Sequence, residues 1–180
     1  CRERFTIMAR DYAAFYRCLS APFRRHPHLA AALRVANRVV EVIMYGAYLV
    51  MLTWLVWRGF RQGWAGVWPQ LWRLVLIPGV GFILLSLVRQ RLNAPRPYEQ
   101  WPISPLIARE KKGNSFPSRH VFSATVIAVA ALWLDWRFGL PLLVLALLLA
   151  VIRVVGGVHY PRDVVVGAIC GLVVGSLLFL

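Results

Sequence analysis

The chain has 180 residues, of which 59% are hydrophobic, and it carries a formal net charge of +14. This length suits one domain, and so high a hydrophobic share excludes an ordinary soluble domain. The charge comes almost entirely from arginine and flanks apolar runs, so anionic lipid is a better partner than nucleic acid. We therefore expect an integral membrane protein, with the cell membrane as its location.

The N-terminal segment mixes arginines with apolar and aromatic side chains, which is the composition of an amphipathic helix in the headgroup region. It is too charged to cross a bilayer, and we expect Pro22 and Pro27 to break it. We assign residues 1–34 to this interfacial segment and residues 35–180 to the transmembrane domain. The three cysteines lack the spacing of a metal site and imply no disulfide framework.

Five apolar runs predict an all-α transmembrane bundle. They are residues 35–57, 71–88, 121–134, 139–152 and 164–180. The last three are short for a span, but neighbouring residues can extend each one. Glu41 lies near the start of the first run, where a charge needs a partner, and Arg38 is three residues earlier on the same face. Tryptophans between the first two runs indicate an interfacial belt.

Five crossings bring four helix ends to one side of the membrane. The second run ends at Arg89 and the third begins after His120, while the fourth ends at Arg153 and the fifth begins after Pro161. A loop as long as the one between the second and third runs is usually functional when it belongs to a compact domain. Three polar stretches can then converge into one site. They are residues 89–97, 117–120 and 153–163.

The last of these stretches places charged groups between two apolar runs, which is costly unless an anion such as phosphate binds there. Pro161 suits the first position of a helix, and Asp163 would then lie in its first turn. Because helical side chains lean towards the N-terminus, Asp163 can reach His159 and hold one ring nitrogen as a donor. The other nitrogen would be free to act as a nucleophile.

The other candidates suit phosphoryl transfer. Arg89, Arg96 and Arg153 supply guanidinium groups for the phosphoryl oxygens. Ser118 and the backbone amides that begin the next helix offer further donors. His120 is placed to protonate the leaving oxygen, and the positive charges around it should keep it neutral until a phosphate dianion arrives. Any one of these arginines alone is more simply explained by contact with lipid headgroups, and their joint spacing favours phosphate binding.

Together these residues resemble the three-part signature of the type 2 phosphatidic acid phosphatase superfamily. The first part is Arg89, six intervening residues and Arg96-Pro97, and the second is the run 117–120. The third is Arg153, five residues, His159, three residues and Asp163. The resemblance covers about half of the chain and its joint spacing is highly specific.

This resemblance implies that His159 becomes phosphohistidine, that Asp163 orients it and that His120 is the general acid. It implies phosphate binding without a metal ion or another cofactor, through Arg89, Arg96, Ser118, Arg119 and Arg153. Family members commonly have six spans, so the expected fold has five to six. Three positions depart from the usual pattern: Arg89 stands where lysine is common, Arg119 replaces a glycine, and Ile152 replaces a serine.

The favoured function is a membrane lipid phosphatase that acts on a phosphomonoester or diphosphate. Candidate substrates are polyprenyl diphosphate, such as undecaprenyl diphosphate, phosphatidic acid and phosphatidylglycerophosphate. The alternatives are a lipid phosphotransferase that uses the same site and a catalytically silent lipid-binding protein. The positive-inside bias places the site in the cytoplasm, whereas members of the resembled family often act on the outer face, and both orientations stay open.

Overall fold

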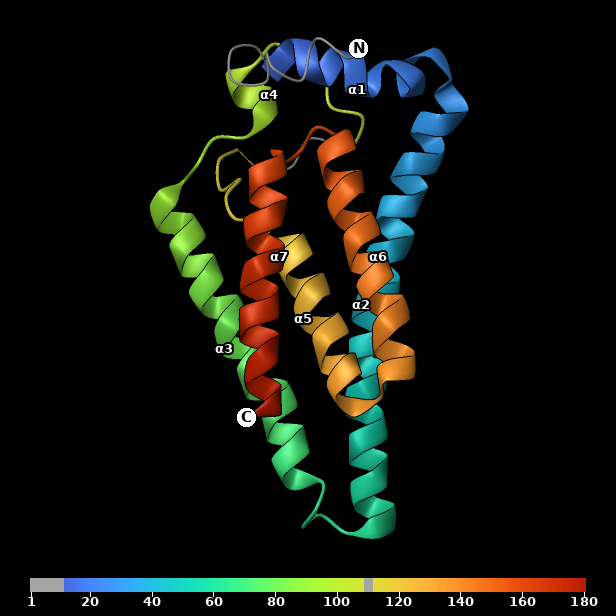
Figure 1. Cartoon of the computed structure of the whole chain (residues 1–180), viewed down its shortest axis with the longest axis vertical. Coiled ribbons are helices and arrows are strands. Elements are labelled where there is room, and N and C mark those ends of the chain that lie inside the picture. The colour runs from blue at the N-terminus through green and yellow to red at the C-terminus, as the bar shows by residue number, and fades with distance from the viewer. Residues whose placement is uncertain (1–11, 109–111) are drawn as a thin grey trace.

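The computed structural model describes residues 12–108 and 112–180, and this part of the chain is helical without a strand (Figure 1). The helices are α1 (Tyr12–Arg25), α2 (Pro27–Gln62), α3 (Trp68–Leu92), α4 (Pro97–Gln100), α5 (Arg119–Leu134), α6 (Trp136–Val155) and α7 (Pro161–Ser176), and a short 3-10 turn, η2, covers Leu177–Phe179. The predicted all-α bundle is therefore confirmed.

Four helices in the described ranges are long and apolar enough to cross a membrane: α2, α3, α6, and α7 together with the η2 turn that continues it. The remaining apolar helix, α5, is shorter and lies at the centre of the bundle, in contact with all four of them. Ten of its 16 residues are buried, whereas the four long helices expose many large apolar side chains. This pattern is expected of a bundle whose outer helices face lipid and whose central helix faces only protein.

A stripe of small residues lets α7 lie close against α5. Gly167, Gly171 and Gly175 recur every four residues on α7, so they share one helix face. A Cβ atom at Gly171 would lie 2.7 Å from Cβ of Thr125, and one at Gly167 would lie 2.6 Å from the carbonyl oxygen of Ser118. These glycines therefore bring the start of α7 up against the residues that begin α5.

The N-terminal helix α1 runs across the ends of the bundle helices in Figure 1. It continues through Pro22 and ends at Arg25, so the prediction that Pro22 breaks this segment was wrong. Pro22 lies in the last turn of α1, where the backbone hydrogen bond that a proline removes affects only the end of the helix. Pro27 does separate the helices, because it begins α2. Cys18 of α1 is in a disulfide, which the cysteine spacing did not indicate.

Aromatic side chains hold α1 against the loops of the site. Tyr12 and Tyr16 form a buried cluster with Ile103 and Tyr160, and Trp101 packs against it. The rings of Tyr12 and Tyr160 meet edge to face, with their centroids 4.7 Å apart. Such contacts add about 0.5–1.5 kcal/mol to the burial of each ring. Through Tyr160, α1 is therefore packed on the residue that precedes α7.

We predict that Gly171→Ala destabilises the protein. The added methyl group would meet Thr125 at 2.7 Å, and overpacking of this kind costs about 1–3 kcal/mol. The midpoint of thermal unfolding in detergent measures the effect. Gly46→Ala is the matched control, because nothing lies within 4 Å of a Cβ atom there and alanine favours a helix. Equal midpoints for the two variants would contradict a tight contact between α5 and α7.

Candidate active site

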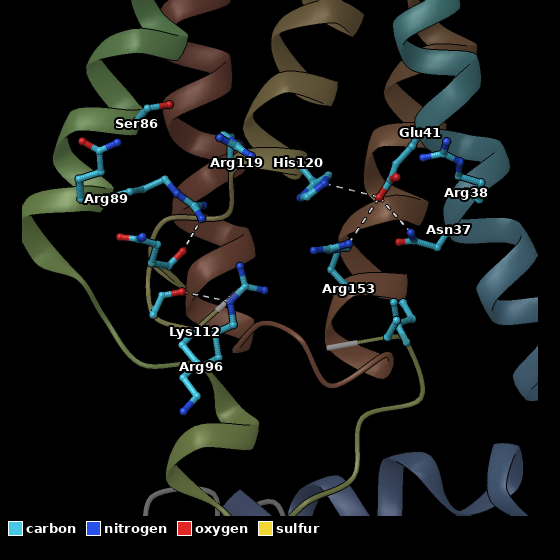
Figure 2. Close-up of a pocket in the computed structure, with 15 residues that line it drawn as sticks. Asn37, Arg38, Glu41, Ser86, Arg89, Arg96, Lys112, Arg119, His120 and Arg153 are labelled. Carbon is cyan, nitrogen blue, oxygen red and sulfur yellow. Dashed lines mark hydrogen bonds and ion pairs between the residues drawn. The ribbon is translucent and has the colours of Figure 1, made fainter. Parts of the chain in front are cut away.

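A cavity of about 690 Å³ lies between α2, α3, α5, α6 and the loop that leads into α5 (Figure 2). Its wall is strongly cationic, and within the described ranges Glu41 is its one carboxylate. The cationic side chains are Arg38, Arg89, Arg96, Lys112, Arg119 and Arg153. Six positive charges around one carboxylate make this space suitable for an anion that carries more than one negative charge.

The three predicted stretches all reach this region. Arg89 and Arg96 come from the first, Arg119 and His120 from the second, and Arg153 from the third. The helix ends explain this convergence, since α3 ends, α5 begins, α6 ends and α7 begins on one side of the bundle (Figure 1).

Two of the arginines also shape the loop. The Arg89 guanidinium donates hydrogen bonds to the carbonyl oxygens of Asn114 and Pro117, and Nε of Arg96 donates to the carbonyl oxygen of Gly113 at 3.1 Å. Both side chains are buried. A buried guanidinium is stable only with acceptors around it, and here the loop supplies some of them. These arginines therefore charge the cavity and hold one of its walls.

Arg119 lies on the side of the cavity that faces α3. Its guanidinium carbon is 5.4 Å from the centroid of the Phe82 ring, a cation–π distance, and the residue is exposed. It thus adds positive charge near the mouth of the cavity, whereas Arg153 is almost fully buried.

The local geometry predicted for the start of α7 is confirmed. Pro161 begins the helix, and Oδ2 of Asp163 accepts a hydrogen bond from the backbone amide of Tyr160 at 3.1 Å, which caps the first turn. The same oxygen lies 3.5 Å from Nδ1 of His159. Asp163 therefore faces one nitrogen of the ring, and the ring presents its other nitrogen elsewhere.

Ser115 is a member of this group that the sequence analysis missed. Its hydroxyl donates a hydrogen bond of 2.6 Å to Oδ2 of Asp163 and lies 3.4 Å from Nδ1 of His159. The backbone amide of Ser118 donates to the carbonyl oxygen of Asp163 at 2.9 Å. Ser115 stands in an irregular loop with no periodicity around it, so no sequence signal indicated that it would meet residues 44 and 48 positions later.

Burial sets the protonation state of His159. The side chain is inaccessible to solvent, and this burial lowers its pKa from 6.5 to about 4, with Arg153 and Arg96 acting in the same direction and Asp163 opposing them. The imidazole is therefore neutral at physiological pH. Its Nε2 atom is buried and has no hydrogen-bond partner among the described residues. His159 does not line the open cavity, although Arg96 and Arg153, which do, are close enough to affect its charge.

Glu41 is a second residue of the site whose contacts the sequence analysis did not predict. Its Oε1 atom lies 3.4 Å from Nη1 of Arg153 and 3.7 Å from Nε2 of His120 (Figure 2). It also accepts a hydrogen bond from Asn37 at 2.9 Å. The expected pair with Arg38 was wrong, because a partner on another helix is nearer. A charge within an apolar span was the available signal, since such residues are functional candidates by default.

Comparison with known proteins identifies the family of this fold. A family model described as the PAP2 superfamily matches residues 70–180. Undecaprenyl-diphosphatase BcrC of Bacillus subtilis is 31% identical over 99 residues, which are 55% of this chain and 51% of BcrC. Decaprenylphosphoryl-5-phosphoribose phosphatase of Mycobacterium tuberculosis is 47% identical over 64 residues, which are 35% of this chain and 34% of that protein. The matched part of the chain thus spans about half of BcrC and about a third of the mycobacterial phosphatase.

Two solved structures match almost the whole chain. The crystal structure of Aquifex aeolicus LpxE has a TM-score of 0.66 at 22% identity and covers 92% of this chain and 93% of its own. The first transmembrane PAP2 type phosphatidylglycerolphosphate phosphatase from Bacillus subtilis has a TM-score of 0.56 at 22% identity, with coverages of 92% and 91%. At this identity the likeness establishes the shared fold. With its four apolar helices, the chain is an integral membrane protein.

The depressed pKa of His159 predicts a pH-dependent stability. Because the unfolded chain protonates this ring near pH 6.5 and the folded protein only near pH 4, stability should fall as the pH drops through this interval. The loss due to this ring should be about 2 kcal/mol between about pH 7 and about pH 5. His159→Gln lacks the titrating group, so its unfolding midpoint in detergent should change less over this range. An equal change in both proteins would contradict a buried neutral imidazole.

Proposed function

The chain belongs to the PAP2 superfamily, and we propose that it is a metal-independent membrane lipid phosphatase that works through a phosphohistidine at His159. The observation that carries this proposal is the neutral, buried imidazole of His159, held by Asp163 beside a cavity with six cationic side chains. A neutral imidazole is a nucleophile, and guanidinium groups stabilise the negative charge of a transferring phosphoryl group. Both requirements of phosphoryl transfer to histidine are therefore met by residues of this chain.

In the first proposed step, Nε2 of His159 attacks phosphorus and the bond from phosphorus to the lipid oxygen breaks. His120 gives a proton to the departing oxygen. Once its nitrogen is bonded to phosphorus, the ring of His159 carries a positive charge, and Asp163 balances that charge through its contact with Nδ1. Ser115 holds the carboxylate from the other side, so the ring keeps its orientation.

In the second step, water attacks the phosphohistidine and the bond from phosphorus to nitrogen breaks. His120, now neutral, takes the proton that the water loses, and orthophosphate leaves. The ring of His159 returns to its neutral form, and the cycle closes without a net change in the enzyme.

We assign phosphate binding to residues from all three stretches. They are Arg89, Arg96, Ser118, Arg119 and Arg153. The hydroxyl of Ser118 supports this assignment, because it is buried and has no hydrogen-bond partner within the described ranges. A buried hydroxyl without a partner is costly, and a phosphate oxygen would satisfy it. The positive charge that phosphoryl transfer needs is supplied by arginine, so the proposed reaction requires no metal ion.

The candidate substrates are polyprenyl diphosphate, phosphatidic acid and phosphatidylglycerophosphate. The first is supported by the likeness to undecaprenyl-diphosphatase BcrC and the third by the fold shared with the Bacillus subtilis phosphatidylglycerolphosphate phosphatase. We also propose that the N-terminal segment assigned to residues 1–34 lies in the headgroup layer and that residues 35–180 form the phosphatase domain. The position of α1 across the ends of the bundle supports this for Tyr12–Arg25, and residues 1–11 lie outside the described residues.

We predict that His159→Ala abolishes phosphate release from purified lipid phosphates while the protein remains folded. The wild-type protein should release orthophosphate from at least one lipid of the candidate panel, and a metal chelator should leave that rate unchanged. Since His159 forms the intermediate, its loss should lower the rate by at least about a thousandfold. A fully active His159→Ala variant would refute the nucleophile, and a chelator-sensitive rate would refute the metal-independent reaction.

We predict a smaller effect for Ser115→Ala, because Ser115 acts only through Asp163 and His159. Loss of a hydrogen bond to a buried carboxylate should lower kcat by about tenfold to a hundredfold and leave KM nearly unchanged. Ser176→Ala is the matched control, since its hydroxyl bonds the backbone at the other end of α7. An unchanged kcat for Ser115→Ala would show that the serine does not position the ring.

A further inference from the structure

Glu41 is a carboxylate in a cavity that otherwise attracts anions. It lies on α2, outside residues 70–180 matched by the family model, and its side chain is only 13% exposed. A phosphate that enters the cavity would be repelled by it, because like charges at contact distance oppose each other strongly where water is scarce. Phosphate binding alone therefore does not account for a carboxylate at this position.

The contacts of Glu41 are those of a bound anion. A single oxygen, Oε1, faces donors from three helices: Asn37 of α2, Arg153 of α6 and His120 of α5, at 2.9, 3.4 and 3.7 Å (Figure 2). Two of these donors, Arg153 and His120, are the groups to which the proposed function assigns a phosphoryl oxygen and the leaving oxygen. The carboxylate thus engages two side chains that the proposed reaction also uses.

We propose that the Glu41 carboxylate takes the place of a phosphate oxygen in the empty site and that an arriving phosphate displaces it. The identification of the ligand as a phosphate group rests on the proposed function. Because Glu41 competes for Arg153 and His120, it weakens the binding of every phosphate, including the orthophosphate product. A site with six cationic side chains would otherwise retain a dianionic product, so the carboxylate promotes its release.

A purely structural role for Glu41 predicts the opposite result. If the carboxylate only held Arg153 and His120 in place for the substrate, its loss would disorder them and weaken phosphate binding. If it competes with phosphate, its loss strengthens binding. The sign of the change therefore separates the two roles. The other charged or titratable groups around it are Arg38 and Tyr45 on α2, Arg89 on α3, Arg119 on α5, and Arg96 and Lys112 in the loop, and they remain in either case.

The test is the affinity of the purified full chain in detergent for orthophosphate, measured by calorimetry and as the inhibition constant in the lipid phosphatase assay. We expect Glu41→Gln to bind orthophosphate about tenfold more tightly than the wild type, as expected when one repulsive charge near a dianion is removed. Glu41→Ala should tighten binding similarly, and it gives the sign of the change in affinity if Glu41→Gln does not fold. Glu41→Asp keeps the charge and should bind as the wild type does.

Asp135→Asn is the charge-matched control. It removes the same charge at the far end of α6 and keeps the side-chain oxygen that caps this helix, so orthophosphate binding should not change. Weaker or unchanged binding by Glu41→Gln and Glu41→Ala would overturn the inference, and so would a wild-type protein that binds no orthophosphate. Failure of the proposed function looks different: the wild type would then release no phosphate from any lipid, whatever the Glu41 variants bind.

Discussion

The buried carboxylate of Asp163 is the interaction on which the rest of the site depends. It has no exposure to solvent, and such a charge is tolerated only when hydrogen-bond donors surround it. Those donors are the hydroxyl of Ser115 and the backbone amide of Tyr160, with the ring of His159 beside them. One side chain therefore caps α7, anchors the loop before α5 and orients the imidazole.

This arrangement needs close helix packing. The amide of Ser118 reaches the carbonyl oxygen of Asp163 at 2.9 Å, and this distance is possible only because Gly167, one turn further along α7, has no side chain. The glycine stripe that continues to Gly175 keeps the two helices together below the site. Because α5 packs against four other helices and most of its residues are buried, it can be short, and among the described residues it is the apolar helix that falls below spanning length.

The sequence predicted the parts of the site that depend on neighbours in the chain. The start of α7 at Pro161 and the contact between Asp163 and His159 follow from helix geometry over four residues, and both were found. The contacts of Ser115 with α7 and of Glu41 with Arg153 join residues 48 and 112 positions apart. Such pairs depend on how the helices are placed, which hydrophobic periodicity does not specify. The irregular loop before α5, where Ser115 lies, gave no periodic signal at all.

The position of Glu41 also changes the charges expected around His120. From the sequence alone, His120 was expected to face only fixed positive charges, whereas in the structure a carboxylate oxygen lies 3.7 Å from Nε2 of its ring. An enzyme gains rate from interactions that are stronger in the transition state than with substrate or product. Guanidinium groups alone bind every phosphate species, so they hold the product as well as the substrate. In our proposal, the Glu41 carboxylate competes for Arg153 and lowers the affinity for all of them, so that the site does not retain the product.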